Sequence, residues 1–188
     1  MLRTSILRKI PPKFSKLMGA RGEATSSYTY PLLHPSVVKA VSDKVPNAWF
    51  HKYDDKADQA YVTHVMGKFT CNNSDCSSNV WNSMKVAIQI KGYPGNGYNA
   101  TVFGQRCRSC NKLGDFSLNE NSYIKRIAYR LKKWAGAEVE IQPYRHKGGP
   151  PHESDYCEGC RLGICTEGDV KDDNLGKDIS SRFIDQFH

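Results

Sequence analysis

The sequence predicts an α+β fold in which a small antiparallel sheet, of the ribbon type, carries one or two packed helices. Apolar and polar residues alternate from 85 to 91, and a second β-like segment, 100–106, follows a turn rich in Gly, Pro and Asn at 93–98. Residues 121–135 repeat apolar side chains at helical spacing. Cysteines stand directly beside the β segments, so the turns of the sheet should bring several thiols together.

Eight soft ligands are the most informative residues of the chain. Their spacings are C-x4-C, C-x2-C and H-x4-C-x2-C-x4-C, and a short turn between two ligands lets both point at one ion. Structural zinc takes closed sets of four, so eight ligands fill two sites with none left over. The odd number of cysteines, with no secretory-type segment before them, argues against disulfides. The predicted ligands are Cys71, Cys76, Cys107, Cys110, His152, Cys157, Cys160 and Cys165.

The spacing also suggests how the ligands divide between the two ions. The first four cysteines are expected to share one ion, because the chain between the two pairs reads as two strands and a turn. The last four ligands then form a second, local site. A pairing in which one ion draws ligands from both ends of the domain stays open. His146 competes with His152, which lies closer to Cys157; the other histidines (His34, His51, His64 and His188) lack a cysteine at ligand spacing and are assigned no role.

Charge and composition divide the chain into three parts. Of the net charge of +8, a large share comes from residues 1–22, which hold six bases and no acid. We expect a flexible basic tail over 1–27, a zinc-binding domain over 28–166, and a disordered acidic tail over 167–188. The basic tail resembles a mitochondrial transit peptide, but its Pro11-Pro12 pair would interrupt the amphipathic helix of such a signal.

The cysteines and the hydropathy bound the setting of the domain. Free thiolate ligands imply a reducing compartment, so we expect a cytoplasmic protein, with the nucleus and mitochondria as alternatives. We expect no transmembrane segment, since no run of about eighteen apolar residues occurs. At a mean hydropathy of -0.60, the two zinc ions should replace much of the core. Structural zinc contributes about 10 kcal/mol to folding, so its removal should unfold the protein.

Before the first cysteine, a helix and a strand are predicted. Residues 35–45 place four valines on one stripe and end before Pro46, which predicts a short packed helix. Residues 61–70 have β character and lead into Cys71. We expect the neighbouring aromatic residues to cover the metal sites: Trp49, Phe50 and Tyr53 as a hydrophobic lid, and Trp81 as a cap on the first site.

The helix over 121–135 offers the main candidate for a partner surface. Asn121 is the predicted cap, Gly136 the predicted end, and residues 138–141 alternate like a short edge strand. Bases beside Tyr129 and Trp134 suit single-stranded nucleic acid, although a solvated helix face is the simpler interpretation. The candidate partner-binding residues on this helix and in the following loop are Lys125, Arg126, Arg130, Lys132, Lys133, Arg145 and Lys147.

These segments resemble the 3CxxC-type zinc-binding domain. The resemblance lies in GKFTC at 67–71, QRCRSC at 105–110, the Pro-His pair at 151–152 and CEGC at 157–160, together with Cys76, Trp81, Gly163 and Cys165. It covers Tyr28 to Thr166, and it is closest to small fungal members through WFH at 49–51 and KKW at 132–134. The first pair, C-x4-C, departs from the spacing in the family's name.

The resemblance implies two classes of partner. Receptor-transporting members of this family help membrane receptors to reach the cell surface and carry a C-terminal membrane anchor, which we do not expect here. Zygote arrest members bind RNA through the zinc domain. We therefore expect a zinc-binding module that presents a surface to a protein client, with RNA as the alternative, and that takes no small-molecule substrate.

An enzyme is not expected. A catalytic zinc keeps one coordination position for water, and two complete sets of four leave none. A zinc deaminase would show H-x-E before P-C-x-x-C, whereas Glu153 directly follows His152 and Tyr156 precedes Cys157. We predict no catalytic residues.

Overall fold

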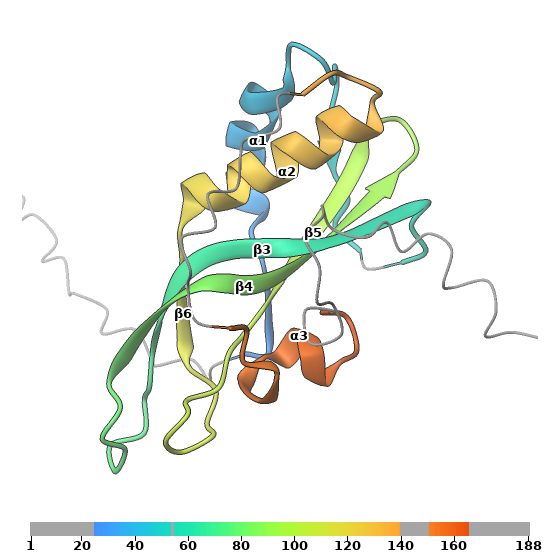
Figure 1. Ribbon diagram of the computed structural model, residues 1–188. Coiled ribbons are helices and arrows are strands. Elements are labelled where there is room, and N and C mark those ends of the chain that lie inside the picture. Colours follow the sequence, from blue (N-terminus) through green and yellow to red (C-terminus); the bar gives the residue numbers. More distant parts are fainter. Residues whose placement is uncertain (1–24, 54, 140–150, 166–188) are drawn as a thin grey trace, which may run out of the picture.

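The computed structural model describes residues 25–53, 55–139 and 151–165, and a curled sheet stands at its centre (Figure 1). A long hairpin, β3 (Gln59–Thr70) and β4 (Val80–Tyr93), continues through a tight turn into β5 (Gly97–Phe103). The strand order is β1-β5-β4-β3-β6, with β1 at Ser27–Thr29 and β6 at Asp115–Leu118. The short β2 (Trp49–Phe50) pairs with β5 in the parallel sense. The predicted α+β fold with an antiparallel, zinc-ribbon-like sheet is confirmed.

β4 is twice the predicted strand, and its two halves differ. Residues 86–90 are almost continuously buried, whereas residues 80–85 alternate between exposed and half-buried. The register with β3 shifts between Val65 and Gly67, so a bulge separates the two halves. Gly67 is needed there, because a Cβ at this position would overlap the ring of Phe116 on β6.

Two helices cover one face of the sheet. α1 (His34–Val41) follows the 3-10 turn η1 (Pro31–Leu33), and α2 (Glu120–Trp134) packs across α1 and β3. Their buried residues Val37, Val41, Tyr123, Ile127 and Leu131 join the inward side chains of β3, β4 and β5 in one apolar cluster. The expectation that zinc replaces the core is therefore wrong in part, since a substantial core fills the helix-covered face.

One end of α2 differs from the sequence prediction and the other agrees with it. The cap is Asn119 and not Asn121: its side chain accepts a hydrogen bond from the Ser122 backbone N–H at 2.9 Å. Gly136 follows with φ of +74°, the left-handed conformation that favours glycine. Residues 137–139 form no strand, and the rest of the predicted edge strand lies outside the described residues.

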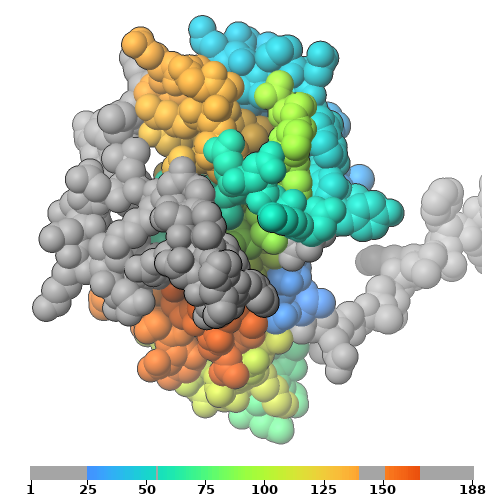
Figure 2. Space-filling model, turned by 90° about the vertical axis from the view of Figure 1, so that its right-hand side faces the viewer, coloured from blue at the N-terminus to red at the C-terminus, as the bar shows by residue number. Residues whose placement is uncertain are grey.

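The opposite face of the sheet carries the C-terminal segment. η2 (Ser154–Tyr156) and α3 (Glu158–Arg161) lie across the sheet from α1 and α2 (Figure 1). A second, smaller cluster of buried residues fixes them there, and it consists of Ala87, Phe103, Cys157 and Cys165. In the space-filling view the segment 151–165 stands well apart from the two helices (Figure 2).

The aromatic residues predicted as a lid over the metal sites lie elsewhere in the fold. Trp49 donates its indole N–H to the Gly95 carbonyl at 3.0 Å and packs on the turn between β4 and β5. Phe50 packs edge-on against Tyr98, and Tyr53 is exposed. Trp49 and Phe50 pair with Gly97 and Tyr98 at the start of β5, whereas Cys107 and Cys110 follow the end of β5, so the predicted lid is wrong. Trp81 stacks on Phe69 and packs against the core of the helix face; its predicted role as a cap on the first site stays a prediction.

None of the helices within the described ranges is long and apolar enough to cross a membrane.

The core on the helix face predicts a sharp contrast between two neighbouring substitutions in α2. Ile127→Ala, at a fully buried position, should lower the free energy of unfolding of the zinc-loaded protein by about 2–5 kcal/mol. The matched control Lys125→Ala, at an exposed position, should change it by less than about 0.5 kcal/mol. Urea titration followed by circular dichroism measures both. Equal effects would show that zinc alone holds the fold.

Candidate metal centres

The first centre forms where two loops meet at the far end of the β3–β4 hairpin. Cys71 directly follows β3, Cys76 lies in the hairpin loop, and Cys107 and Cys110 lie in the loop after β5. The four sulfur atoms all lie within 4.8 Å of one another. The Sγ–Sγ distance is 3.6 Å both for Cys71–Cys110 and for Cys76–Cys107.

Tight backbone turns aim these sulfurs. The Cys76 N–H donates to the Asn73 carbonyl, and the Asn111 N–H donates to the Cys107 carbonyl. Asn111 takes a positive φ of 58°, which asparagine tolerates better than most residues. Each turn therefore reverses the chain within a few residues and leaves its two thiols on the same side.

The spacing of the sulfurs fits a tetrahedral zinc ion. With Zn–S bonds of about 2.3 Å, two ligands of a tetrahedral site stand about 3.8 Å apart, close to the observed 3.6 Å. A disulfide would need about 2.05 Å, and all seven cysteines are free. The first four cysteines therefore form one all-thiolate set, and the pairing that mixes ligands from both ends of the domain is not the one observed.

The second centre combines His152 with the last three cysteines. Their ligand atoms also lie within 4.8 Å of one another. The Nε2 atom of His152 is 3.2 Å from the Cys160 Sγ and 3.7 Å from the Cys165 Sγ. A tetrahedral site with one imidazole and one thiolate gives about 3.6 Å for this separation. His152 is thus the histidine of the set, and the competing His146 lies outside the described residues.

Contacts with the end of β5 fix the second centre to the sheet. The Glu158 N–H donates to the Gly104 carbonyl, and the Arg106 N–H donates to the Tyr156 carbonyl. The Arg106 Nε donates to the Glu158 carboxylate at 2.5 Å. Because Arg106 directly precedes Cys107, the same loop carries ligands of the first centre and backbone contacts of the second.

Burial and hydrogen bonding give the ligand thiols different pKa values. Burial raises the pKa of Cys71 to about 12. Cys107 is also buried, but the N–H groups of Cys110 and Ser109 outweigh that effect and lower its pKa to about 6. A hydrogen bond from Cys165, aided by His152, lowers the pKa of Cys157 to about 4. Each set thus contains a ready thiolate, and zinc must displace the remaining protons as it binds.

His64 is a neighbour of the second centre that the sequence did not indicate. It lies on β3, and its Nε2 is 3.7 Å from the Cys165 Sγ. Its ring centroid is 5.6 Å from that of His152. The available signal was its place on the strand face opposite Tyr61 and Val65, the face that the C-terminal segment covers.

Two of the five basic residues predicted for the partner surface of α2 are buried or paired in the structure. Arg130 does not belong to it: the residue is 9% exposed, and its guanidinium lies 3.1 Å from the centre of the Tyr61 ring. Lys132 is paired with Asp43 at 2.7 Å. Lys125 and Lys133 are exposed and Arg126 is half-buried, whereas Arg145 and Lys147 lie outside the described residues.

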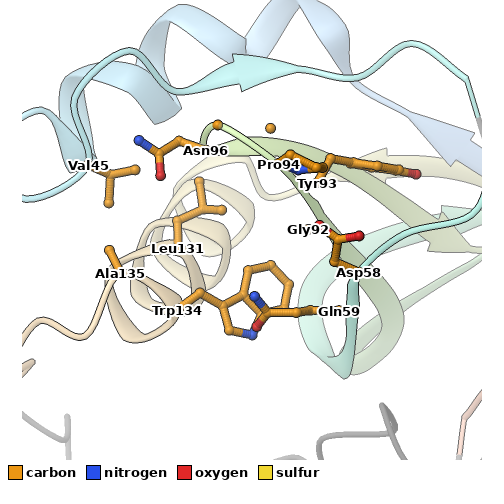
Figure 3. A pocket seen from close by; sticks show the side chains of 12 residues that line it. Val45, Asp58, Gln59, Gly92, Tyr93, Pro94, Asn96, Leu131, Trp134 and Ala135 are labelled. Atoms are coloured by element: carbon orange, nitrogen blue, oxygen red, sulfur yellow. The ribbon is translucent and has the colours of Figure 1, made fainter.

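A pocket of about 230 Å³ lies between the end of α2 and the turn after β4 (Figure 3). Trp134, Leu131 and Tyr93 line it together with Asp58. Asp58 is the one carboxylate in its lining, which holds no cysteine or histidine. The pocket therefore contains neither a set of soft metal ligands nor a pair of carboxylates.

The fold and the two ligand sets define a protein with two structural zinc sites built on an antiparallel ribbon, one with four cysteines and one with three cysteines and a histidine. The family model of the 3CxxC zinc ribbon, described as a zinc-binding domain, matches residues 64–163, and the chain belongs to this family. Neither a curated protein nor a solved structure matches the chain.

The two sets predict how zinc content responds to paired substitutions. Under a competing chelator, the protein should retain two zinc ions, and Cys76→Ser with Cys110→Ser should retain one, because both changes disable one set. Cys76→Ser with Cys160→Ser should retain none. Mass spectrometry under native conditions counts the ions, and the exposed neighbour Ser77→Ala serves as the control. One ion retained by the cross-set pair would contradict the assignment.

Proposed function

We propose that this domain is a non-enzymatic, zinc-stabilised module that binds a protein partner through the outer face of its β3–β4 hairpin. The observation that carries the proposal is an exposed, nearly uncharged sheet surface. We call it the hairpin face, and it consists of Met66, Lys68 and Thr70 on β3 and Val80, Asn82 and Met84 on β4.

The composition of the hairpin face suits a protein better than a nucleic acid. Met66, Val80 and Met84 are 37%, 49% and 69% exposed, which is high for large apolar side chains on one surface. Methionine adapts its shape to a partner and is enriched in protein interfaces, whereas charged residues are depleted from interface centres. Lys68 is the single charged residue of the face, and RNA binding depends on many phosphate contacts.

The zinc centres lie at both ends of the hairpin face. Thr70 directly precedes Cys71 of the first centre, and Met66 comes two residues after His64, which lies beside the second centre. A surface fixed at both ends loses little conformational freedom when a partner binds, which improves affinity. This arrangement supports a structural role for the metal ions in partner binding, in which they hold the hairpin face in shape.

The absence of enzymatic activity is part of the proposal. Each ion would have four protein ligands, and a catalytic zinc requires a free position for water or substrate. The ligand chemistry also suits a reducing compartment such as the cytoplasm, where thiolates stay free.

RNA is the second candidate. Lys125 and Lys133 are exposed on α2, and the resemblance to zygote arrest proteins supports this alternative, just as that to receptor-transporting proteins supports a protein client. The burial of Arg130 and the pairing of Lys132 with Asp43 weaken the basic surface that RNA would need.

Two double variants distinguish the candidates. Met66→Asp with Met84→Asp places charge on the hairpin face and should abolish recovery of a defined polypeptide by the tagged protein from nuclease-treated lysate. Lys125→Glu with Lys133→Glu should leave that recovery unchanged. Both variants should keep two zinc ions, which shows that they fold. Recovery that requires intact RNA and fails only in the lysine variant would instead establish the RNA alternative.

A further inference from the structure

His64 stands beside the second zinc centre without being one of its four ligands. The set whose ligand atoms all lie within 4.8 Å of one another consists of His152, Cys157, Cys160 and Cys165. The His64 Nε2 lies 3.7 Å from the Cys165 Sγ, a distance that suits an N–H···S hydrogen bond. The residues that meet here are 101 positions apart in the sequence.

Small residues on both sides of the contact allow this approach. His64 pairs in register with Ala87 on β4, which is fully buried under the C-terminal segment. Gly159 lies directly over it, since a Cβ at Gly159 would stand 2.9 Å from the Cβ of Ala87 and 3.2 Å from the Cβ of Cys165. The packing of these residues therefore sets how closely Cys165 comes to β3.

The net charge of the second zinc set explains why a hydrogen-bond donor beside Cys165 would matter. Three thiolates and one neutral imidazole around Zn²⁺ leave one net negative charge, and Cys157 and Cys165 are only 0% and 8% exposed. A negative charge with little access to water requires hydrogen-bond donors nearby. Donors to the ligands of a metal also orient them and tune their affinity for the ion.

We propose that His64 is a positioning residue of the second zinc centre, whose Nε2–H donates a hydrogen bond to the Cys165 thiolate. The donor reduces the electron density on that sulfur and holds it in the direction required by the ion. The same hydrogen bond connects the central strand of the sheet to the C-terminal ligand set.

The first test measures zinc affinity by competition with a chromophoric chelator. His64→Ala should weaken the second centre by about tenfold or more, the usual effect of removing a donor to a metal ligand, and should leave the first centre unchanged. His64→Gln keeps an N–H donor and should restore much of the affinity. His51→Ala, at a histidine paired with Asp55 near the other end of the sheet, is the control.

A second readout separates this role from simple packing. In protein loaded with Co²⁺, the second centre, with three thiolates, absorbs at higher energy than the all-thiolate first centre, so the two can be followed separately. Loss of the donor in His64→Ala should move the thiolate-to-cobalt charge-transfer band of the second centre to lower energy, and His64→Gln should move it back.

Two results would overturn the proposal. Unchanged affinity and an unchanged cobalt spectrum in His64→Ala would show that the contact does not act on the metal. Retention of tight zinc in His152→Ala, lost on adding His64→Ala, would show that His64 is an interchangeable ligand and not a donor to Cys165.

Discussion

Metal–thiolate coordination is the interaction on which the end of this fold that lies beyond the helices depends. Beyond the end of the helices, Cys71, Cys76, Cys107 and Cys110 bring the β3–β4 hairpin loop and the loop after β5 together. Side-chain hydrogen bonds such as Ser78–Ser109 join the same two loops. Their sulfurs lie at the separation that a tetrahedral ion imposes. Without a cation, burial keeps the proton on Cys71, and only the hydrogen bonds between the loops would be left to offset the cost of ordering them.

The two faces of the sheet are stabilised by different interactions. One face is an ordinary apolar core, in which Ile127 and Leu131 of α2 pack on Ile88 and Ile90 of β4. The other face holds the small Ala87–Phe103 cluster beneath the second ligand set. Removing zinc should therefore affect this face and the hairpin end first, while the helix face keeps its hydrophobic driving force. The sheet connects the two faces structurally, because β3 and β4 contribute residues to both.

Much of this architecture could be predicted from local signals, and the exceptions share a cause. The ligand spacings and the helical stripe of α2 depend on residues close in sequence, so both zinc sets and α2 were predictable. The role of His64 depends on a contact across 101 residues, and that of Trp49 on the turn at Gly95. Arg130 could have been recognised as buried, since it lies three residues after Ile127 and four before Trp134, on the packed side of the helix.

The order of the ligand sets along the chain has a consequence for synthesis on the ribosome. The first set is complete once residue 110 has emerged, whereas the second needs the chain as far as Cys165. A nascent chain can thus capture its first ion while α2 is still inside the exit tunnel. The β3–β4 hairpin would then already have its final register when the last cysteines emerge. His64 would already be in place on β3 to contact Cys165.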